Sequence, residues 1–215
     1  VFRQFDEVVL ARGTIFEKWV NGYEAYAAEE RAANAHSGEG YLPKVGFSDF
    51  VRFLVLYLFG GLYVDADVAT LQDLWPLYGR QFTYRWGFRN AYNTAVLGLG
   101  APRSSLAAKL SQAAMDDDHG YASFHPYRLL GYCEKGRFRC LDMLPSEAFD
   151  PLWLHMIGYD MSPQRYIINR RKQFFRWGVG MNAKNVKSKF FPGALTYHWH
   201  NGWHEAPKHG SAAWA

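Results

Sequence analysis

The sequence predicts an α/β fold in which helices flank a mixed, mostly parallel sheet. Segments rich in Ala, Glu and Leu alternate along the chain with short runs of β-branched and aromatic residues. This order is typical of helices and strands that alternate around one sheet. The 215 residues are also 49% hydrophobic and 18% aromatic, which is enough for one folded domain with a sizeable core.

The first predicted helix covers residues 14–34, which are rich in Ala and Glu. Residues 35–46 contain Gly and Pro and are expected to form a loop. A second helix is expected to begin at Ser48, whose hydroxyl is suited to cap it, with Asp49 in the first turn, where the helix dipole favours a carboxylate. Because residues 53–58 are apolar on most sides, we expect this helix to be buried.

Gly60 and Gly61 are predicted to end the second helix with a left-handed C-cap. The residues that follow, 62–64, are apolar and of β type, and they predict a buried interior strand. Further strands are expected at residues 83–88, 93–99 and 194–200, and further helices at residues 104–118 and 127–133.

Positive charge is concentrated near the C-terminus. The net charge is +4, and no acidic residue lies between Asp160 and Glu205. Such a basic block suits a phosphate-bearing ligand, an anionic acceptor or a membrane surface, and it equally suits a solvated face with no partner. Nucleic acid is not expected as a partner, because no nucleic-acid-binding module accompanies the charge. The cationic residues are Arg165, Arg170, Arg171, Lys172, Arg176, Lys184, Lys187 and Lys189.

Two cysteines, Cys133 and Cys140, lie close together in the sequence. In a reducing compartment they would be free thiols or half of a metal site. In an oxidising compartment they would close a short loop, with a stabilisation of roughly 2–3 kcal/mol. We favour the disulfide, which implies a secretory-pathway or extracellular setting.

The sequence gives no sign of a membrane span or a signal peptide. No apolar run reaches the roughly 18 residues that a spanning helix needs, and the N-terminal residues carry acids where an apolar segment would lie. Because the chain begins with Val1 instead of Met, we expect it to be an excised or incomplete domain.

Two aspartates, Asp65 and Asp67, directly follow the strand predicted at residues 62–64. In open α/β sheets, ligands bind at the carboxyl ends of the strands. Two carboxylates there would repel each other and lose hydration, which favours a bound cation. Mn²⁺ and Mg²⁺ prefer oxygen ligands and keep positions open for substrate phosphates. The alternative is a turn with two solvated aspartates.

The stretch around these aspartates resembles a known family. Residues 48–68, "SDFVRFLVLYLFGGLYVDADV", resemble the DXD sugar-binding region of family 32-type glycosyltransferases, S-D-x-x-R-(x)-Y-x-x-G-G-[IV]-Y-x-D-x-D. The rest of the chain is more loosely similar to the α-1,4-glycosyltransferase branch, the globotriaosylceramide synthase-like proteins. The similar segments are "YNTAVLGLGAPRS", "YCEKGRFRCLDMLPSEAFDPL" and "ALTYHWHNGW".

The resemblance implies a GT-A-type fold, with residues 1–215 as a single glycosyltransferase catalytic domain. It implies transfer of a hexose from a UDP-sugar to a glycan, glycolipid or protein acceptor, with retention of configuration and with Mn²⁺, or Mg²⁺ in its place, as cofactor. It further implies the Golgi or another secretory-pathway lumen if the source is eukaryotic, with membrane association through segments outside this chain. A non-catalytic carbohydrate-binding relic of the same fold is the alternative. A glycoside hydrolase is disfavoured, because its carboxylates should stand at least about 5 Å apart across the bond.

The resemblance also implies site residues. Asp65 and Asp67 would bind the metal together with a late histidine, His198. His200 is its rival, because both histidines would lie on one face of a strand. No catalytic nucleophile can be assigned. The implied donor-sugar contacts are Asp49, Arg52, Tyr63, Asp65 and Asn93.

Simpler roles are open for several of these residues. Asp49 and Arg52 are three apart and would form a local ion pair on one helix face. Tyr63 would serve sheet packing, and Asn93 would be an ordinary turn residue. Glu147, in the L-P-x-E-A-F segment, is a weaker candidate for orienting the acceptor or a loop.

One segment of the family pattern is missing from this sequence. Family members begin with a strand that contacts uridine, written I-P-K-x-[IL]-H-x-x-W, and nothing in residues 1–47 resembles it. Either the chain starts late or its nucleotide-binding half has diverged. We expect the domain to lack the N-terminal uridine-binding strand.

Overall fold

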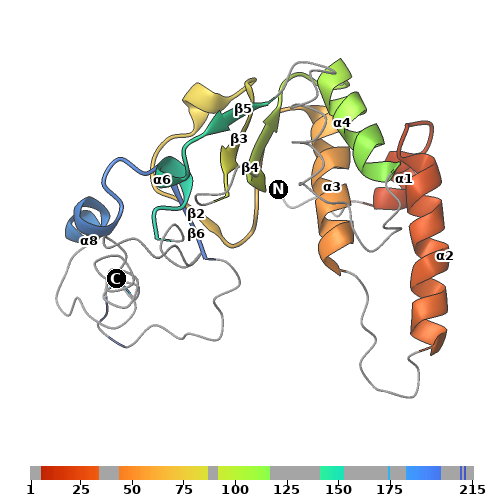
Figure 1. Cartoon of the computed structure of the whole chain (residues 1–215), viewed down its shortest axis with the longest axis horizontal. Coiled ribbons are helices and arrows are strands. Elements are labelled where there is room, and N and C mark those ends of the chain that lie inside the picture. Colours follow the sequence, from red (N-terminus) through yellow and green to blue (C-terminus); the bar gives the residue numbers. More distant parts are fainter. Residues whose placement is uncertain are drawn as a thin grey trace. The chain divides into compact units, whose positions relative to one another are not determined.

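The structure is a computed structural model (Figure 1), and it describes residues 6–33, 44–86, 92–116, 141–152, 174, 183–199, 209 and 211. The helix predicted at 127–133 lies outside these residues. The chain divides into two compact units. Unit 1 comprises Val1–Tyr63, Gly79–Gln81 and Gly98–Leu141, and unit 2 comprises Val64–Tyr78, Phe82–Leu97 and Asp142–Ala215.

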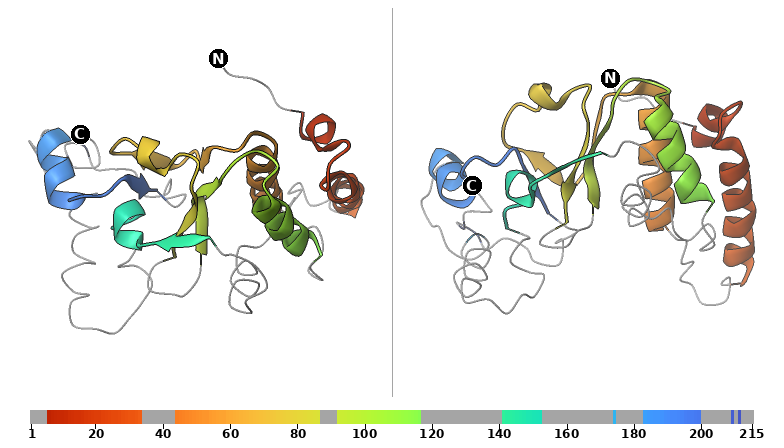
Figure 2. Two further views of the ribbon diagram at one scale, coloured as in Figure 1. Left: turned by 90° about the horizontal axis from the view of Figure 1, so that it is seen from above. Right: turned by 45° about the horizontal axis from the view of Figure 1, so that its top comes forward.

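The described part of unit 1 contains four helices, and aromatic rings fill much of its core. Phe50 on the third helix stacks on Trp19, with ring centroids 4.3 Å apart, and meets Phe16 edge-on at 5.5 Å. The third and fourth helices lie side by side (Figure 2). The second and fourth helices confirm the predictions for residues 14–34 and 104–118. The four helices are α1 (Glu7–Ala11), α2 (Glu17–Ala33), α3 (Lys44–Phe59) and α4 (Ser105–Met115).

Helix α3 begins earlier than the sequence predicted. It starts at Lys44, so Ser48 and Asp49 lie inside the helix and not at its N-terminus. The predictions of a loop up to residue 46 and of a cap at Ser48 are therefore wrong. Aromatic packing accounts for the longer helix, because the Phe47 ring stacks on Tyr23 at a centroid distance of 4.7 Å. This tertiary contact outweighs the local capping preference of a serine.

The end of α3 follows the prediction more closely. Phe53, Leu54 and Leu56 are buried, as expected, but Phe59 is 53% exposed. Gly60 and Gly61 have φ angles of +64° and +87°, which confirms the left-handed turn after the helix.

The main sheet is mixed. Its strand order is β1-β4-β3-β5, with β1 at Leu62–Val64, β3 at Gln81–Arg85, β4 at Tyr92–Leu99 and β5 at Asp142–Leu144. Strands β3 and β5 are parallel. Only six residues, 86–91, join the neighbours β3 and β4, which is too short for a crossover between parallel strands. The prediction of a mixed sheet is thereby confirmed, whereas the expectation that the sheet is mostly parallel is not.

Strand β1 was predicted to be buried and interior, and it is neither. Its three residues are half-buried, and it stands at one end of the order among the described strands. The neighbouring β4 takes the interior place, because all eight of its residues are buried and it can offer apolar side chains to both faces of the sheet.

Unit 2 contains a second, two-stranded sheet. Strand β2 (Val68–Thr70) pairs antiparallel with β6 (Thr196–His198), which pairs Val68 with His198. Strand β6 lies within the strand predicted at 194–200, whereas β2 was not predicted. The unit also contains η1 (Trp75–Leu77), α6 (Ser146–Phe149) and α8 (Ala183–Phe190). Its apolar cluster consists of Leu152, Phe174, Val186, Phe190, Phe191, Ala194 and Tyr197.

Within the described part of the chain, no helix combines the length and apolar character that crossing a membrane requires.

Candidate metal centre

A tight turn between β1 and β2 carries Asp65 and Asp67. The backbone N–H of Asp65 donates to the carbonyl of Ala95 on β4 at 2.8 Å. The carbonyl of Asp65 accepts from the N–H of Val68 at 3.0 Å, which closes the turn. Ala66 between the aspartates is exposed. The turn therefore holds two carboxylates close together, with a small exposed residue between them.

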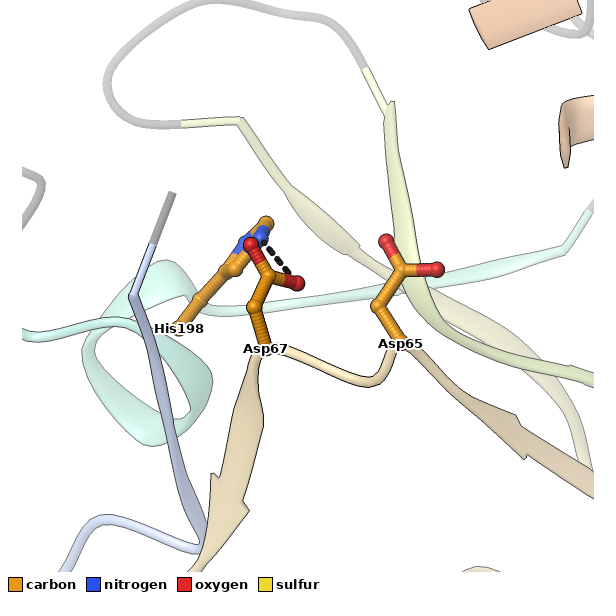
Figure 3. Close-up of side chains that lie close together, drawn as sticks. All are labelled: Asp65, Asp67 and His198. Carbon is orange, nitrogen blue, oxygen red and sulfur yellow. Dashed lines mark ion pairs between the residues drawn. The ribbon is translucent and has the colours of Figure 1, made fainter. Parts of the chain in front are cut away.

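The pairing of β2 with β6 brings His198 to this turn. His198 pairs with Val68, and the N–H of Trp199 donates to the carbonyl of Asp67 at 2.8 Å. The imidazole Nε2 of His198 lies 3.3 Å from Asp67 Oδ1, and the two side chains are only 10% and 12% exposed. Strand register thus fixes a histidine near the end of the chain beside the second aspartate (Figure 3).

Asp65, Asp67 and His198 form a group that fits a divalent cation. One ligand atom from each residue lies within 4.8 Å of the others. Two ligand atoms on opposite sides of a small divalent ion stand about 4–5 Å apart, so little movement of the side chains is needed. Carboxylate oxygens suit Mg²⁺ and Mn²⁺, and an imidazole nitrogen suits the transition metals, so the donor set is compatible with a divalent metal ion.

A residue that the sequence did not suggest lies behind the histidine. Tyr84 on β3 places its hydroxyl 3.2 Å from His198 Nδ1. Its ring is 1% exposed and stacks on Phe149 of α6 at a centroid distance of 5.0 Å. The sequence predicted a strand at residues 83–88 but gave no signal that one of its side chains would reach the late histidine.

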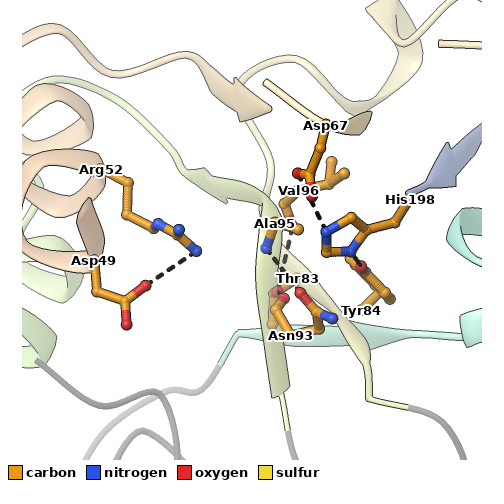
Figure 4. A network of polar contacts seen from close by, with 9 residues as sticks. All are labelled: Asp49, Arg52, Asp67, Thr83, Tyr84, Asn93, Ala95, Val96 and His198. Atoms are coloured by element: carbon orange, nitrogen blue, oxygen red, sulfur yellow. Dashed lines mark hydrogen bonds and ion pairs between the residues drawn. The ribbon is translucent and has the colours of Figure 1, made fainter. Parts of the chain in front are cut away.

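Asn93 supports the backbone near Asp65. Its side-chain oxygen accepts a hydrogen bond from the N–H of Ala95 at 2.9 Å (Figure 4). The carbonyl of Ala95 in turn accepts from the N–H of Asp65. The Thr83 hydroxyl also donates to the carbonyl of Asn93. The amide oxygen of Asn93 is therefore engaged by the protein itself, and the predicted contact with the donor sugar stays a prediction.

Replacing Asn93 with Ala should destabilise the fold, because the buried N–H of Ala95 loses its side-chain acceptor. We expect the free energy of unfolding, measured with urea, to fall by about 1–3 kcal/mol. Asn21→Ala is the matched control, because it removes the same side chain from an exposed position on α2 and should change stability by less than about 0.5 kcal/mol. Equal losses in the two variants would contradict a supporting role for Asn93.

Asp49, Arg52 and Tyr63 belong to unit 1, where Arg52 contacts each of the other two. Arg52 Nη1 lies 3.2 Å from Asp49 Oδ1 (Figure 4), and the guanidinium carbon lies 5.1 Å from the centroid of the Tyr63 ring. The local ion pair that the spacing suggested is confirmed. Since this pair is largely buried, its charges stabilise each other in a setting where either alone would be costly. Donor binding by these three residues stays a prediction.

Glu147, the weaker candidate for orienting the acceptor or a loop, lies on the short helix α6. Glu147 is exposed in the first turn of α6, where the helix dipole favours its charge.

The basic block is described only in part. Its residues Lys184, Lys187 and Lys189 are exposed on α8, and Lys187 donates to the carbonyl of Leu71. The rival ligand His200, both cysteines and the rest of the basic block lie outside the described residues.

The comparison with protein families agrees with this site. Residues 17–84, about a third of the chain, match the model of a family described as a glycosyltransferase sugar-binding region containing a DXD motif. The matched residues include Asp65 and Asp67. This match supports a relation of residues 17–84 to a glycosyltransferase family. Neither the curated proteins nor the solved structures that were compared gave a match.

Proposed function

We propose that this chain is the catalytic domain of a metal-dependent glycosyltransferase of the family 32 or α-1,4 type. It would transfer a hexose from a UDP-sugar to a glycan, glycolipid or protein acceptor, with retention of configuration. The observation that carries the proposal is the meeting of Asp65, Asp67 and His198 within 4.8 Å at the DXD segment. A GT-A-type arrangement is compatible with the mixed sheet and its helices.

The side chains of this site have distinct tasks in the proposed reaction. Asp65 and Asp67 would hold Mn²⁺ through carboxylate oxygens, and His198 would hold it through Nε2. When bound, such an ion neutralises a diphosphate and stabilises the charge that develops on the leaving group. The low exposure of Asp67 and His198 limits competition from water, which strengthens electrostatic interactions at the site.

In unit 1, Arg52 would contact the donor. Its guanidinium is held by the Asp49 carboxylate on one side and lies over the Tyr63 ring. A guanidinium held in this way is preorganised for hydroxyl or phosphate oxygens, because less side-chain entropy is lost on binding.

A screen of UDP-sugar donors tests the proposal. The full chain is incubated with UDP-galactose, UDP-N-acetylglucosamine or UDP-glucose, and released UDP is measured with Mn²⁺ and with excess chelator. We expect Mn²⁺-dependent hydrolysis of one donor, and its loss on chelation. Asp67→Ala should be inactive and serves to exclude a contaminating enzyme.

The same screen addresses the alternative of a non-catalytic carbohydrate-binding relic. The low exposure of the Asp67 and His198 side chains also fits a protein that holds a sugar nucleotide without cleaving it. Donor binding by calorimetry, without UDP release from any donor, would favour the relic and overturn the proposed activity.

A further inference from the structure

The contact between Tyr84 and His198 joins the candidate metal centre to the interior of unit 2. The Tyr84 hydroxyl meets Nδ1 of the imidazole at 3.2 Å, while Nε2 of the same ring faces Asp67 at 3.3 Å (Figure 4). Each ring nitrogen therefore has a polar neighbour within 3.3 Å, and these contacts fix the orientation of the imidazole.

Tyr84 is itself held firmly. Its ring is 1% exposed and lies nearly parallel to Phe149, with an interplanar angle of 13°. The strand that carries it, β3, is paired with β5 so that Tyr84 is opposite Leu144. The carbonyl of Phe149 accepts from the Thr196 hydroxyl on β6 at 2.7 Å. The same short helix thus supports both the tyrosine and the strand of the histidine.

A hydroxyl suits this position chemically. A neutral imidazole carries one N–H, and only the nitrogen without it can bind a metal. If Nε2 is to bind an ion beside Asp67, the hydrogen must be on Nδ1, where it donates to the Tyr84 oxygen. In the other tautomer, Nε2–H donates to Asp67 and the Tyr84 O–H donates to Nδ1. One hydroxyl therefore supports the ring in both states.

We propose that Tyr84 is a positioning residue for metal binding: it holds the imidazole of His198 with Nε2 toward Asp67 and accepts the Nδ1 hydrogen when Nε2 binds the ion. The inference rests on the proposed metal dependence of the transferase and adds to it a residue that does not touch the ion. Outer partners of this kind orient ligating histidines and raise the affinity of a site for its metal.

The test is a direct measurement of Mn²⁺ affinity, by the electron paramagnetic resonance signal of free Mn²⁺, on the full chain without donor. Tyr84→Phe keeps the ring that packs on Phe149 and removes only the hydroxyl. We expect affinity to fall by about 10- to 100-fold. Donor hydrolysis should recover at saturating Mn²⁺, which a general folding defect would not allow.

Two further variants make the test specific. Tyr197→Phe is the matched control: it removes a hydroxyl from the residue next to His198, whose ring packs instead in the apolar cluster with Phe191. It should bind Mn²⁺ like the wild type. In a double-mutant cycle, Tyr84→Phe should have no further effect on affinity once His198 is Ala, because the tyrosine acts through the histidine.

The outcomes are distinguishable. Unchanged affinity in Tyr84→Phe, with normal binding by the wild type, overturns the role of Tyr84 and leaves the proposed function intact. The role of Tyr84 is also overturned if Tyr84→Phe lowers Mn²⁺ affinity by the same factor whether residue 198 is His or Ala. A wild-type chain that binds no Mn²⁺ overturns both this inference and the proposed metal dependence.

Discussion

Replacing Asp67 with Asn is expected to lower Mn²⁺-dependent hydrolysis of the UDP-sugar donor at least about a thousandfold. The substitution keeps the size of the side chain and removes its charge. The carboxylate lies 3.3 Å from His198 Nε2 and belongs to the three-residue group around the candidate metal position. If the ion contributes about 4 kcal/mol to transition-state stabilisation, its loss corresponds to this factor.

Asp73→Asn is the matched control for this experiment. Asp73 is an exposed residue whose Oδ1 accepts from the N–H of Trp75 at 2.9 Å, and Asn can make the same contact. Its donor hydrolysis should equal that of the wild type. Initial rates are measured across a Mn²⁺ titration, and thermal unfolding is recorded for both variants. A folded Asp67→Asn protein with more than a tenth of wild-type activity would refute a metal role for this carboxylate.

The second large effect is expected at Gly60, where Ala should reduce the free energy of unfolding by about 3 kcal/mol or more. The glycine has a φ of +64°, and an added Cβ would lie 2.8 Å from the carbonyl oxygen of Gly100 and 2.9 Å from the nitrogen of Pro102. Both are backbone atoms, which cannot rotate away as a side chain would. Backbone strain and steric overlap therefore both lower the free energy of unfolding of this variant.

Gly79→Ala separates these two contributions. Gly79 has a φ of +75°, but an added Cβ would meet nothing within 4 Å. It should cost only the strain of a left-handed alanine, about 1–2 kcal/mol. Urea unfolding of the two variants and the wild type gives the comparison. Equal losses at Gly60 and Gly79 would show that overlap with Gly100 and Pro102 contributes nothing.

Features encoded within a few adjacent residues could be predicted from the sequence. Gly60 and Gly61 follow an apolar helix and take the left-handed conformation that their position suggested. The spacing of Asp49 and Arg52 indicated an ion pair, and the structure contains it. The helix start predicted at Ser48 from its capping preference was wrong, because packing of the Phe47 ring favours a helix that begins at Lys44.

Features that depend on contacts between distant segments could not be predicted from residue patterns alone. Strand β2 has only three residues, and its pairing with β6 is what brings His198 to Asp67. His198 was proposed as a ligand only through the family resemblance. Tyr84 was not proposed at all, because its role depends on the placement of three separate elements, β3, β6 and α6.

Metal binding and the pairing of β2 with β6 are expected to depend on each other. Two ligands are supplied early in the chain, and the third arrives only when Thr196–His198 has joined Val68–Thr70. An ion that prefers the paired state therefore stabilises it by mass action, by about 2.7 kcal/mol at 100 times its dissociation constant. In the proposed enzyme, the bound metal ion would therefore hold β6, from late in the chain, against β2, from early in the chain. The metal concentration would govern the fraction of molecules in which the two strands are paired.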